Sequence, residues 1–137
     1  MRFINTESSG RGVAHYSAGV IHNGLFYVSG QLSIDPATGK VPEGGVAAET
    51  RQALLNLEAV LTEAGAKKTD VIQCRVYTPD VDFWNDINAV YAEFFGDHKP
   101  ARCVVPTTRL HFGCLVEIEA VAALPSVQWE EAKHGAV

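Results

Sequence analysis

The sequence has few cysteines and no long apolar run, and each absence excludes a class of protein. Its three cysteines, Cys74, Cys103 and Cys114, include no CxxC pair, and an odd number cannot form a fully paired disulfide framework. No run of about 18 apolar residues that could cross a membrane occurs. The N-terminus, MRFINTESSG, lacks the apolar segment of a secretory signal. We therefore expect a cytoplasmic protein with no membrane partner.

Positive charge is scarce as well, because 11 lysines and arginines stand against 16 aspartates and glutamates, for a formal net charge of -5. Domains that bind nucleic acid usually carry a basic surface that neutralises phosphates, so no nucleic-acid partner is expected. The five histidines lack metal-ligand spacing, and no glycine-rich phosphate loop is present. We therefore expect neither a metal nor a cofactor.

The composition that remains is that of one globular domain. The 137 residues are 47% hydrophobic and 20% charged, which suits a single core of ordinary size. We expect this domain to span residues 1–125. The remaining residues, 126–137, are expected to form a peripheral C-terminal tail.

Local patterns in the first half of the chain predict a hairpin and a helix. Asn23-Gly24 lies between two β-prone segments and predicts a two-residue hairpin turn within residues 16–30. Apolar residues recur at three- and four-residue steps over residues 46–64, which predicts a helix that ends before Gly65.

The second half of the chain predicts three strands and a second helix. Residues 71–78 are β-branched and aromatic, and Asp82 is a candidate N-cap of a helix that runs to about Phe95. Residues 103–108 predict a further strand, which the helical crossover should place parallel to the preceding one. Residues 115–124 alternate in polarity and predict the last strand.

These elements together predict an α+β fold, a mixed sheet of about six strands with two helices on one face. Two helices cannot cover both faces, and the strands carry apolar side chains in both directions, as in Cys103-Val104-Val105. The uncovered face would expose more apolar surface than a monomer tolerates. We therefore expect the chain to self-associate.

Arg102 and Glu117 are the most informative polar residues. Arg102 stands where a helix-to-strand loop meets a strand, and a guanidinium there suits bidentate capture of a carboxylate. Glu117 and Glu119 alternate onto the face opposite Ile118, where a carboxylate is costly unless it is solvated, paired or functional. The alternative interpretation is a structural ion pair between Arg102 and either glutamate.

Cys103 has two possible roles. It is either a nucleophile or an inert buried thiol.

The segment PARCVVPTTRL, followed by HFGCL and then VEIEAVA, resembles the signature of the RidA/YjgF family of enamine and imine deaminases. HYSAGVIHNGLFYVSGQLSIDPATGKVP resembles the family's N-terminal hairpin and its Ser-Gly-Gln turn. AAETRQALLNLEAVLTEAG resembles its first helix, and DFWNDINAVYAEFFGDHKPAR its second helix and exit loop. The resemblance covers residues 14–123 of the chain.

The resemblance implies a homotrimer with the chorismate-mutase-like α+β fold and three clefts at subunit interfaces. It also implies a hydrolytic deaminase without a cofactor, which converts a small 2-imino or 2-enamino acid to a 2-keto acid and ammonia. Arg102 matches the arginine that binds the substrate carboxylate, and Glu117 matches the glutamate that positions water. The substrate pocket is implied to be completed by Tyr16, Ser29, Gly30, Cys103 and Val104.

The sequence departs from the family pattern at three places. Val104 stands where many relatives have cysteine, Leu110-His111 replaces a Leu-Pro pair, and Pro106 implies an edge or a bulge in its strand. These departures leave open a larger unsaturated amine, such as 2-aminomuconate or aminoacrylate, as the substrate. The non-catalytic alternative is a trimeric small-molecule-binding or holdase module.

Overall fold

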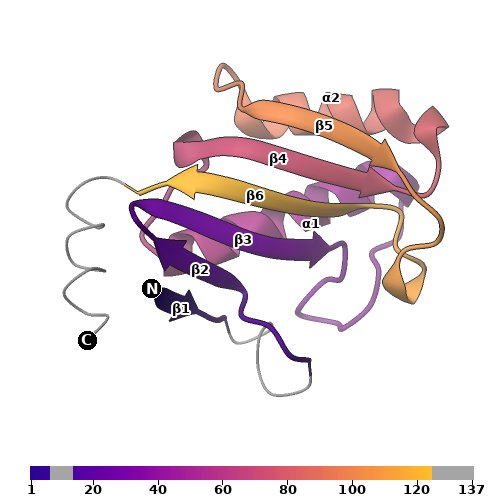
Figure 1. Ribbon diagram of the computed structural model, residues 1–137. Helices are drawn as coiled ribbons and strands as arrows, with labels where there is room; N and C mark the ends of the chain where they lie inside the picture. The colour runs from indigo at the N-terminus through magenta and orange to yellow at the C-terminus, as the bar shows by residue number, and fades with distance from the viewer. Residues whose placement is uncertain (7–13, 125–137) are drawn as a thin grey trace.

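The computed structural model describes residues 1–6 and 14–124 of the chain (Figure 1). Six strands form one sheet in the order β1-β2-β3-β6-β4-β5. Their bounds are Arg2–Ile4 for β1, Gly19–His22 for β2, Leu25–Leu32 for β3, Val71–Thr78 for β4, Ala101–Pro106 for β5 and Glu117–Ala123 for β6. The tail expected over residues 126–137, and residue 125 at the expected domain end, lie outside the described residues.

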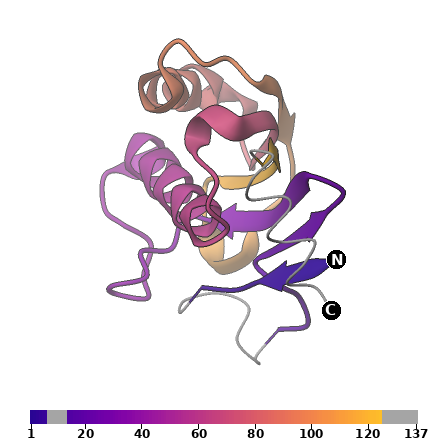
Figure 2. The same ribbon diagram turned by 90° about the vertical axis from the view of Figure 1, so that its left-hand side faces the viewer.

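Two helices, α1 (Gly45–Glu63) and α2 (Trp84–Phe95), pack together on one face of this sheet, as Figure 2 shows. Neighbouring strands run antiparallel except β4 and β5, which are parallel and are joined through α2. The predicted α+β fold, a mixed sheet with both helices on one face, is confirmed. Within the described ranges, neither helix combines the length and the apolar character that a bilayer-spanning helix needs.

The predicted hairpin is formed by β2 and β3, and its turn has the backbone geometry that the two turn residues favour. Asn23 and Gly24 both have positive φ, 52° and 76°, which a tight turn between right-twisted strands requires. β3 continues beyond the last β2 pairing, Gly19 with Val28. No described strand therefore covers the outer edge of residues 30–32.

Each helix buries one apolar face. The buried apolar residues of α1 recur at helical spacing, as the sequence predicts, and are Val46, Ala53, Leu54, Leu57, Val60 and Leu61. The helix ends before Gly65, whose φ of 79° is the left-handed conformation that glycine adopts readily.

The expected N-cap of the second helix is wrong. Asp80, and not Asp82, accepts a backbone hydrogen bond through its side chain, from the N–H of Asp82 at 2.9 Å. Asp80 has the extended backbone that an N-cap needs, whereas Asp82 lies inside the 3₁₀ turn η2 (Val81–Phe83). This turn precedes α2, so the helix itself begins at Trp84.

β5 is an edge strand and lies two residues earlier than the predicted range of 103–108. It ends at Pro106 because its parallel partner β4 ends at Thr78, with which Pro106 pairs. A proline is tolerated there because no strand on the outer side needs its missing N–H. The edge position that Pro106 implied is confirmed.

β6 alternates as its sequence predicts. Ile118, Ala120 and Ala122 are buried toward the helices, whereas Glu117 and Glu119 lie on the opposite face and are half-buried. Neither helix covers this opposite face, which we call the open face. Its apolar residues include Tyr27, Tyr77, Val105 and Val121.

Candidate functional site

Arg102 lies on the helix-covered side of the sheet, against α2. Its register partner on β4 is Cys74, which is fully buried. The Nη1 of Arg102 donates to Asn88 Oδ1 at 2.9 Å. Its guanidinium carbon lies 4.7 Å from the ring centroid of Tyr91 and 5.3 Å from that of Trp84. These cation–π contacts and the hydrogen bond together hold the planar guanidinium in one orientation.

The positive charge of Arg102 stays without an anionic partner in the described part of the chain. The two ion pairs found there are Arg51 with Glu93 and Arg75 with Glu119. Burial raises the pKa of the neighbouring Cys74 thiol to about 11, so this group is neutral at pH 7. The N–H groups that Asn88 does not occupy can therefore bind a carboxylate from outside the chain.

No ion pair between Arg102 and Glu117 or Glu119 is formed within the described part of the chain. Glu119 instead lies 3.3 Å from Arg75 and accepts a hydrogen bond from the Tyr77 hydroxyl at 2.6 Å. Both glutamates lie on the open face, Arg102 lies on the helix-covered side, and β4 separates β5 from β6. The strand pleat thus keeps the charges apart.

Glu117, at the start of β6, lies over the backbone of Gly30 in β3. A Cβ added to Gly30 would come within 2.7 Å of Glu117 Oε2. A side chain at position 30 would therefore displace the carboxylate. The register shift between Val28 and Gln31 falls at this point of the strand.

The surroundings of Glu117 disfavour its charged form. Burial is the main cause that raises the pKa of this carboxyl, and the charge of Glu119 raises it further, whereas His111 acts in the opposite direction. No hydrogen bond or ion pair joins the Glu117 side chain to another described residue. A half-buried carboxylate of this kind is suited to accept a proton from water.

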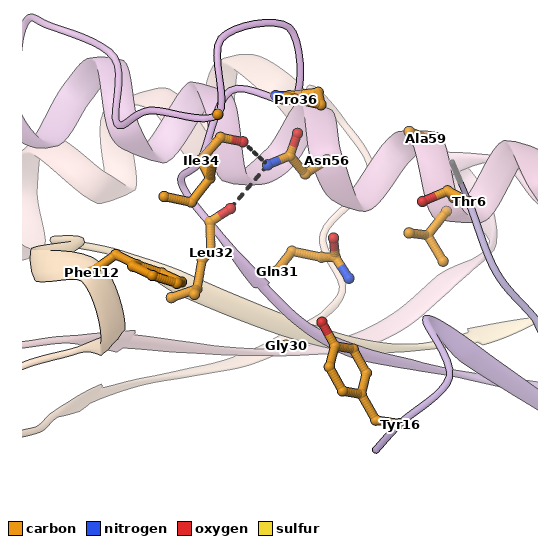
Figure 3. Close-up of a pocket in the computed structure, with 12 residues that line it drawn as sticks. Thr6, Tyr16, Gly30, Gln31, Leu32, Ile34, Pro36, Asn56, Ala59 and Phe112 are labelled. Carbon is orange, nitrogen blue, oxygen red and sulfur yellow. Dashed lines mark hydrogen bonds between the residues drawn. The ribbon is translucent and has the colours of Figure 1, made fainter. Parts of the chain in front are cut away.

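Ser29 and Tyr16 lie next to Gly30. The Ser29 hydroxyl donates to the Ser17 carbonyl at 2.6 Å, and the Ser29 N–H donates to the Ala18 carbonyl at 2.9 Å. These bonds fix the segment that carries Tyr16 beside the end of β3. Figure 3 shows the Tyr16 ring with its hydroxyl directed toward Gly30.

A cavity of about 440 Å³ opens between the uncovered edge of β3, α1 and the turn η3 (His111–Gly113) (Figure 3). We call it the β3 cavity. Its lining residues are Thr6, Tyr16, Gly30, Gln31, Leu32, Ile34, Pro36, Gly39, Asn56, Ala59, Val60 and Phe112. Two of the predicted pocket residues, Tyr16 and Gly30, thus meet at a cavity.

Glu49 of α1 holds the two sides of this region together. It is only 4% exposed, and its Oε1 accepts hydrogen bonds from the Ser33 hydroxyl and the Leu115 N–H, both at 2.8 Å. One side chain therefore links the end of β3 to the segment that leads into Glu117. Sequence reasoning missed this residue because its position within an apolar helix face gives no sign of its partners.

The remaining predicted residues lie elsewhere. Cys103 is exposed and pairs in register with Arg75, whereas Val104 packs against the core, and neither lines the β3 cavity. One chain therefore brings Tyr16, Ser29, Gly30 and Glu117 together and holds Arg102 separately.

Sequence reasoning also missed the residues that hold Arg102. Trp84, Asn88 and Tyr91 all contact its guanidinium. Their spacing of i, i+4 and i+7 places them on one helix face, which was the available signal. Among the described residues, no group of three or more histidine, cysteine or carboxylate side chains is placed to hold a metal ion.

The chain is similar in sequence and in fold to proteins that are already known. A family model described as endoribonuclease L-PSP matches residues 6–124. The human protein named 2-iminobutanoate/2-iminopropanoate deaminase is 36% identical over 121 residues, which cover 88% of each chain. The solved structure of the *Escherichia coli* YjgF gene product has a TM-score of 0.83 at 36% identity and covers 90% of this chain and 98% of its own. The structure of *E. coli* TdcF with bound serine has a TM-score of 0.84 at 31% identity and covers 91% of this chain and all of its own.

Proposed function

The chain belongs to the RidA/YjgF family, and from that premise we propose that it is a hydrolytic deaminase that needs no cofactor. Its substrates are 2-imino acids or their 2-enamine tautomers, and its products are 2-keto acids and ammonia. The observation that carries the proposal is Arg102, a rigidly held guanidinium without an anionic partner among the described residues.

Arg102 binds the substrate carboxylate in this proposal. Its guanidinium presents parallel N–H donors that match the two carboxylate oxygens, and α2 holds the group in place before the substrate arrives. A relative, *E. coli* TdcF, was solved with serine, which also carries a carboxylate. The relative named 2-iminobutanoate/2-iminopropanoate deaminase supports the same substrate class.

Glu117 accepts a proton from the attacking water. The oxygen of that water forms a bond to the imine carbon, the C=N π electrons move to nitrogen, and Glu117 passes its proton to that nitrogen, which gives a carbinolamine. Glu117 then moves the hydroxyl proton of the carbinolamine to the amine nitrogen, so that the C–N bond breaks, ammonia leaves and the C=O bond of the 2-keto acid forms. An imine is already electrophilic, so alignment and proton transfer suffice and no cofactor takes part.

The separation of Arg102 from Glu117 indicates a site shared between chains. The two residues lie on opposite sides of the sheet in one chain, so Arg102 of one subunit must meet Glu117 of another to act on one substrate. Arg102 lies in the edge strand, where a second chain can approach it. The open face, through its apolar residues Tyr27, Tyr77, Val105 and Val121, supplies the contact surface in this proposal. We propose a homotrimer, as the family resemblance implies.

The test is release of ammonia and 2-keto acid from imines that an amino-acid oxidase generates in situ. Wild-type protein should accelerate release above the spontaneous rate, and Arg102→Ala should remove most of the acceleration. Absence of any acceleration by wild-type protein would favour the binding or holdase alternative.

A parallel assay for RNA cleavage tests the activity named in the description of the family model. The net charge of -5 leads us to expect no RNA cleavage.

A further inference from the structure

The β3 cavity has the chemistry of an apolar binding site. None of the described residues that line it carries a charge. The side-chain amides in its wall already form hydrogen bonds within the chain. Asn56 Nδ2 donates to the Leu32 and Ile34 carbonyls at 2.9 and 2.8 Å (Figure 3). Gln31 Nε2 donates to the Ser29 carbonyl at 3.0 Å. The surface left for a ligand is formed largely by aliphatic and aromatic groups.

Phe112 is an unusual part of this wall. It is 69% exposed, and its φ of 60° is a conformation that bulky side chains rarely adopt. It also lines an adjoining hollow of about 350 Å³ with Ile34, Lys40 and Val41, so its ring stands between the β3 cavity and a second space that has one cation in its wall. A strained and exposed aromatic ring contributes little to the core of this chain. Its position suits contact with a ligand.

The cavity borders the group that we propose as the proton acceptor. Gly30 lines the cavity, and the Glu117 carboxylate lies directly over Gly30. Phe112 follows His111, which is close enough to Glu117 to influence its charge. The same turn and the same glycine therefore connect the reacting centre to the cavity.

We propose that the β3 cavity receives the side chain of the imino acid and that Phe112 is a specificity-determining residue. The preferred substrates are 2-imino acids with branched aliphatic or aromatic side chains, such as those derived from leucine and phenylalanine. This inference rests on the proposed deaminase function.

Size and charge both favour this substrate class. The β3 cavity measures about 440 Å³, so it has room for an isobutyl or benzyl side chain, and either group contacts more of its wall than the methyl group of 2-iminopropanoate. The described residues that line the β3 cavity include no cation, so a dicarboxylate such as 2-aminomuconate would place its second charge there without a partner among them. An apolar side chain avoids that cost.

The test compares kcat/KM for imines derived from leucine, phenylalanine, alanine and glutamate. In wild-type protein we expect the leucine-derived imine to exceed the alanine-derived imine by about tenfold or more. Ala59→Phe adds a ring where α1 lines the cavity, and it should remove this preference by lowering kcat/KM much more for the leucine-derived imine than for the alanine-derived imine. Thr62→Phe, at an exposed position of the same helix away from the cavity, is the matched control and should retain the preference.

Phe112→Ala provides a second, independent variant. It should lower kcat/KM for the leucine-derived imine by about tenfold more than kcat/KM for the alanine-derived imine. The cavity assignment would be overturned if kcat/KM in wild-type protein were equal for the leucine- and alanine-derived imines and if neither Ala59→Phe nor Phe112→Ala changed it. The deaminase function would still stand in that case. A preference for the glutamate-derived imine would overturn it as well.

Equilibrium binding separates the two proposals. Calorimetric titration with 4-methyl-2-oxopentanoate and with pyruvate needs no turnover. Suppose that wild-type protein hydrolyses no imine but binds 4-methyl-2-oxopentanoate at least about tenfold more tightly than pyruvate, and that Ala59→Phe abolishes this difference in affinity. The cavity assignment would then stand, and the deaminase function would be overturned. Equal or undetectable binding of both acids, together with absent turnover, overturns both.

Discussion

The surroundings of Arg102 and Glu117 differ: neighbouring side chains hold Arg102 in place, whereas burial disfavours the charge of Glu117. Arg102 is held by its neighbours, because Asn88 accepts one of its N–H groups and the rings of Tyr91 and Trp84 flank the guanidinium. Glu117 has no partner among the described residues, and its burial disfavours the ionised form. The first side chain is therefore fixed for binding, and the second is suited to proton transfer.

Arg102→Lys keeps the charge but removes the two parallel donors. We expect kcat/KM for imines with a carboxylate to fall by about 10- to 100-fold, because one charge-assisted hydrogen bond contributes about 1.5–3 kcal/mol. Arg51→Lys is the matched control, since Arg51 is exposed on α1 and pairs with Glu93 at 3.9 Å. Wild-type kinetics in Arg102→Lys would show that this arginine does not bind the carboxylate.

Glu117→Gln should slow turnover by about 10²–10⁴-fold, because the amide cannot accept a proton from water. In wild-type protein, kcat/KM should fall as the pH drops through the pKa of Glu117, which burial raises above the ordinary glutamate value. This acid limb should be absent from the residual activity of Glu117→Gln.

The same raised pKa predicts the sign of a stability effect. The folded chain binds the Glu117 proton more tightly than the unfolded chain, so this carboxyl favours folding at pH values below its unfolded pKa. That contribution is lost as the pH rises through the raised folded pKa. The Tm of Glu117→Gln relative to wild type should therefore increase between acid and neutral pH, and the opposite trend would contradict the assignment.

At the scale of elements, α2 acts as the support of the carboxylate-binding group. Its residues 84, 88 and 91 share one face and meet Arg102 at the start of β5. The parallel pairing of β4 with β5 places Arg102 beside Cys74, on the side where α2 lies. The helix can therefore set the orientation of the Arg102 guanidinium without contacting the reacting carbon itself.

Asn88→Asp tests this positioning role. The new carboxylate would pair with Arg102 and compete with the substrate, so we expect KM to rise by about tenfold or more with a smaller change in kcat. Asn88→Ala, which removes the hydrogen-bond acceptor without adding charge, should raise KM less. Both variants should keep the Tm within a few degrees of wild type. An unchanged KM in Asn88→Asp would mean that Arg102 does not face the substrate.

At the scale of the whole molecule, the sheet has one face under helices and one open face, on which apolar side chains lie beside the ion pair of Arg75 with Glu119. The proposed catalytic groups lie on different sides of it, so assembly and activity should be lost together. Light scattering should show one species of three times the 14.8 kDa of a single chain.

Tyr27→Glu should weaken this assembly, because Tyr27 is 47% exposed on the open face and a carboxylate there would be desolvated on association. Turnover should decline with the trimer as the protein is diluted. Leu55→Glu is the matched control, since Leu55 is 49% exposed on α1 and should leave the mass and the rate unchanged. A stable, active monomer would contradict the shared site.

The sequence by itself determined those parts of the fold that depend on neighbours close along the chain. Asn23-Gly24 specifies the hairpin because both residues tolerate positive φ. The apolar period of α1 and the alternation of β6 likewise follow from the geometry of single elements. The presence of an uncovered face could be inferred because two helices cover only one side of a sheet.

Only the tertiary structure decided which side chains meet. The place of β6 between β3 and β4 brings Glu117 over Gly30, and the parallel register of β5 directs Arg102 toward α2 and away from Glu117. These contacts join residues that are distant in sequence, and a shift of one residue in strand register would send each side chain to the other face. The β3 cavity depends in the same way on how far β3 extends beyond β2 and on the left-handed backbone of Phe112, which no local pattern specifies.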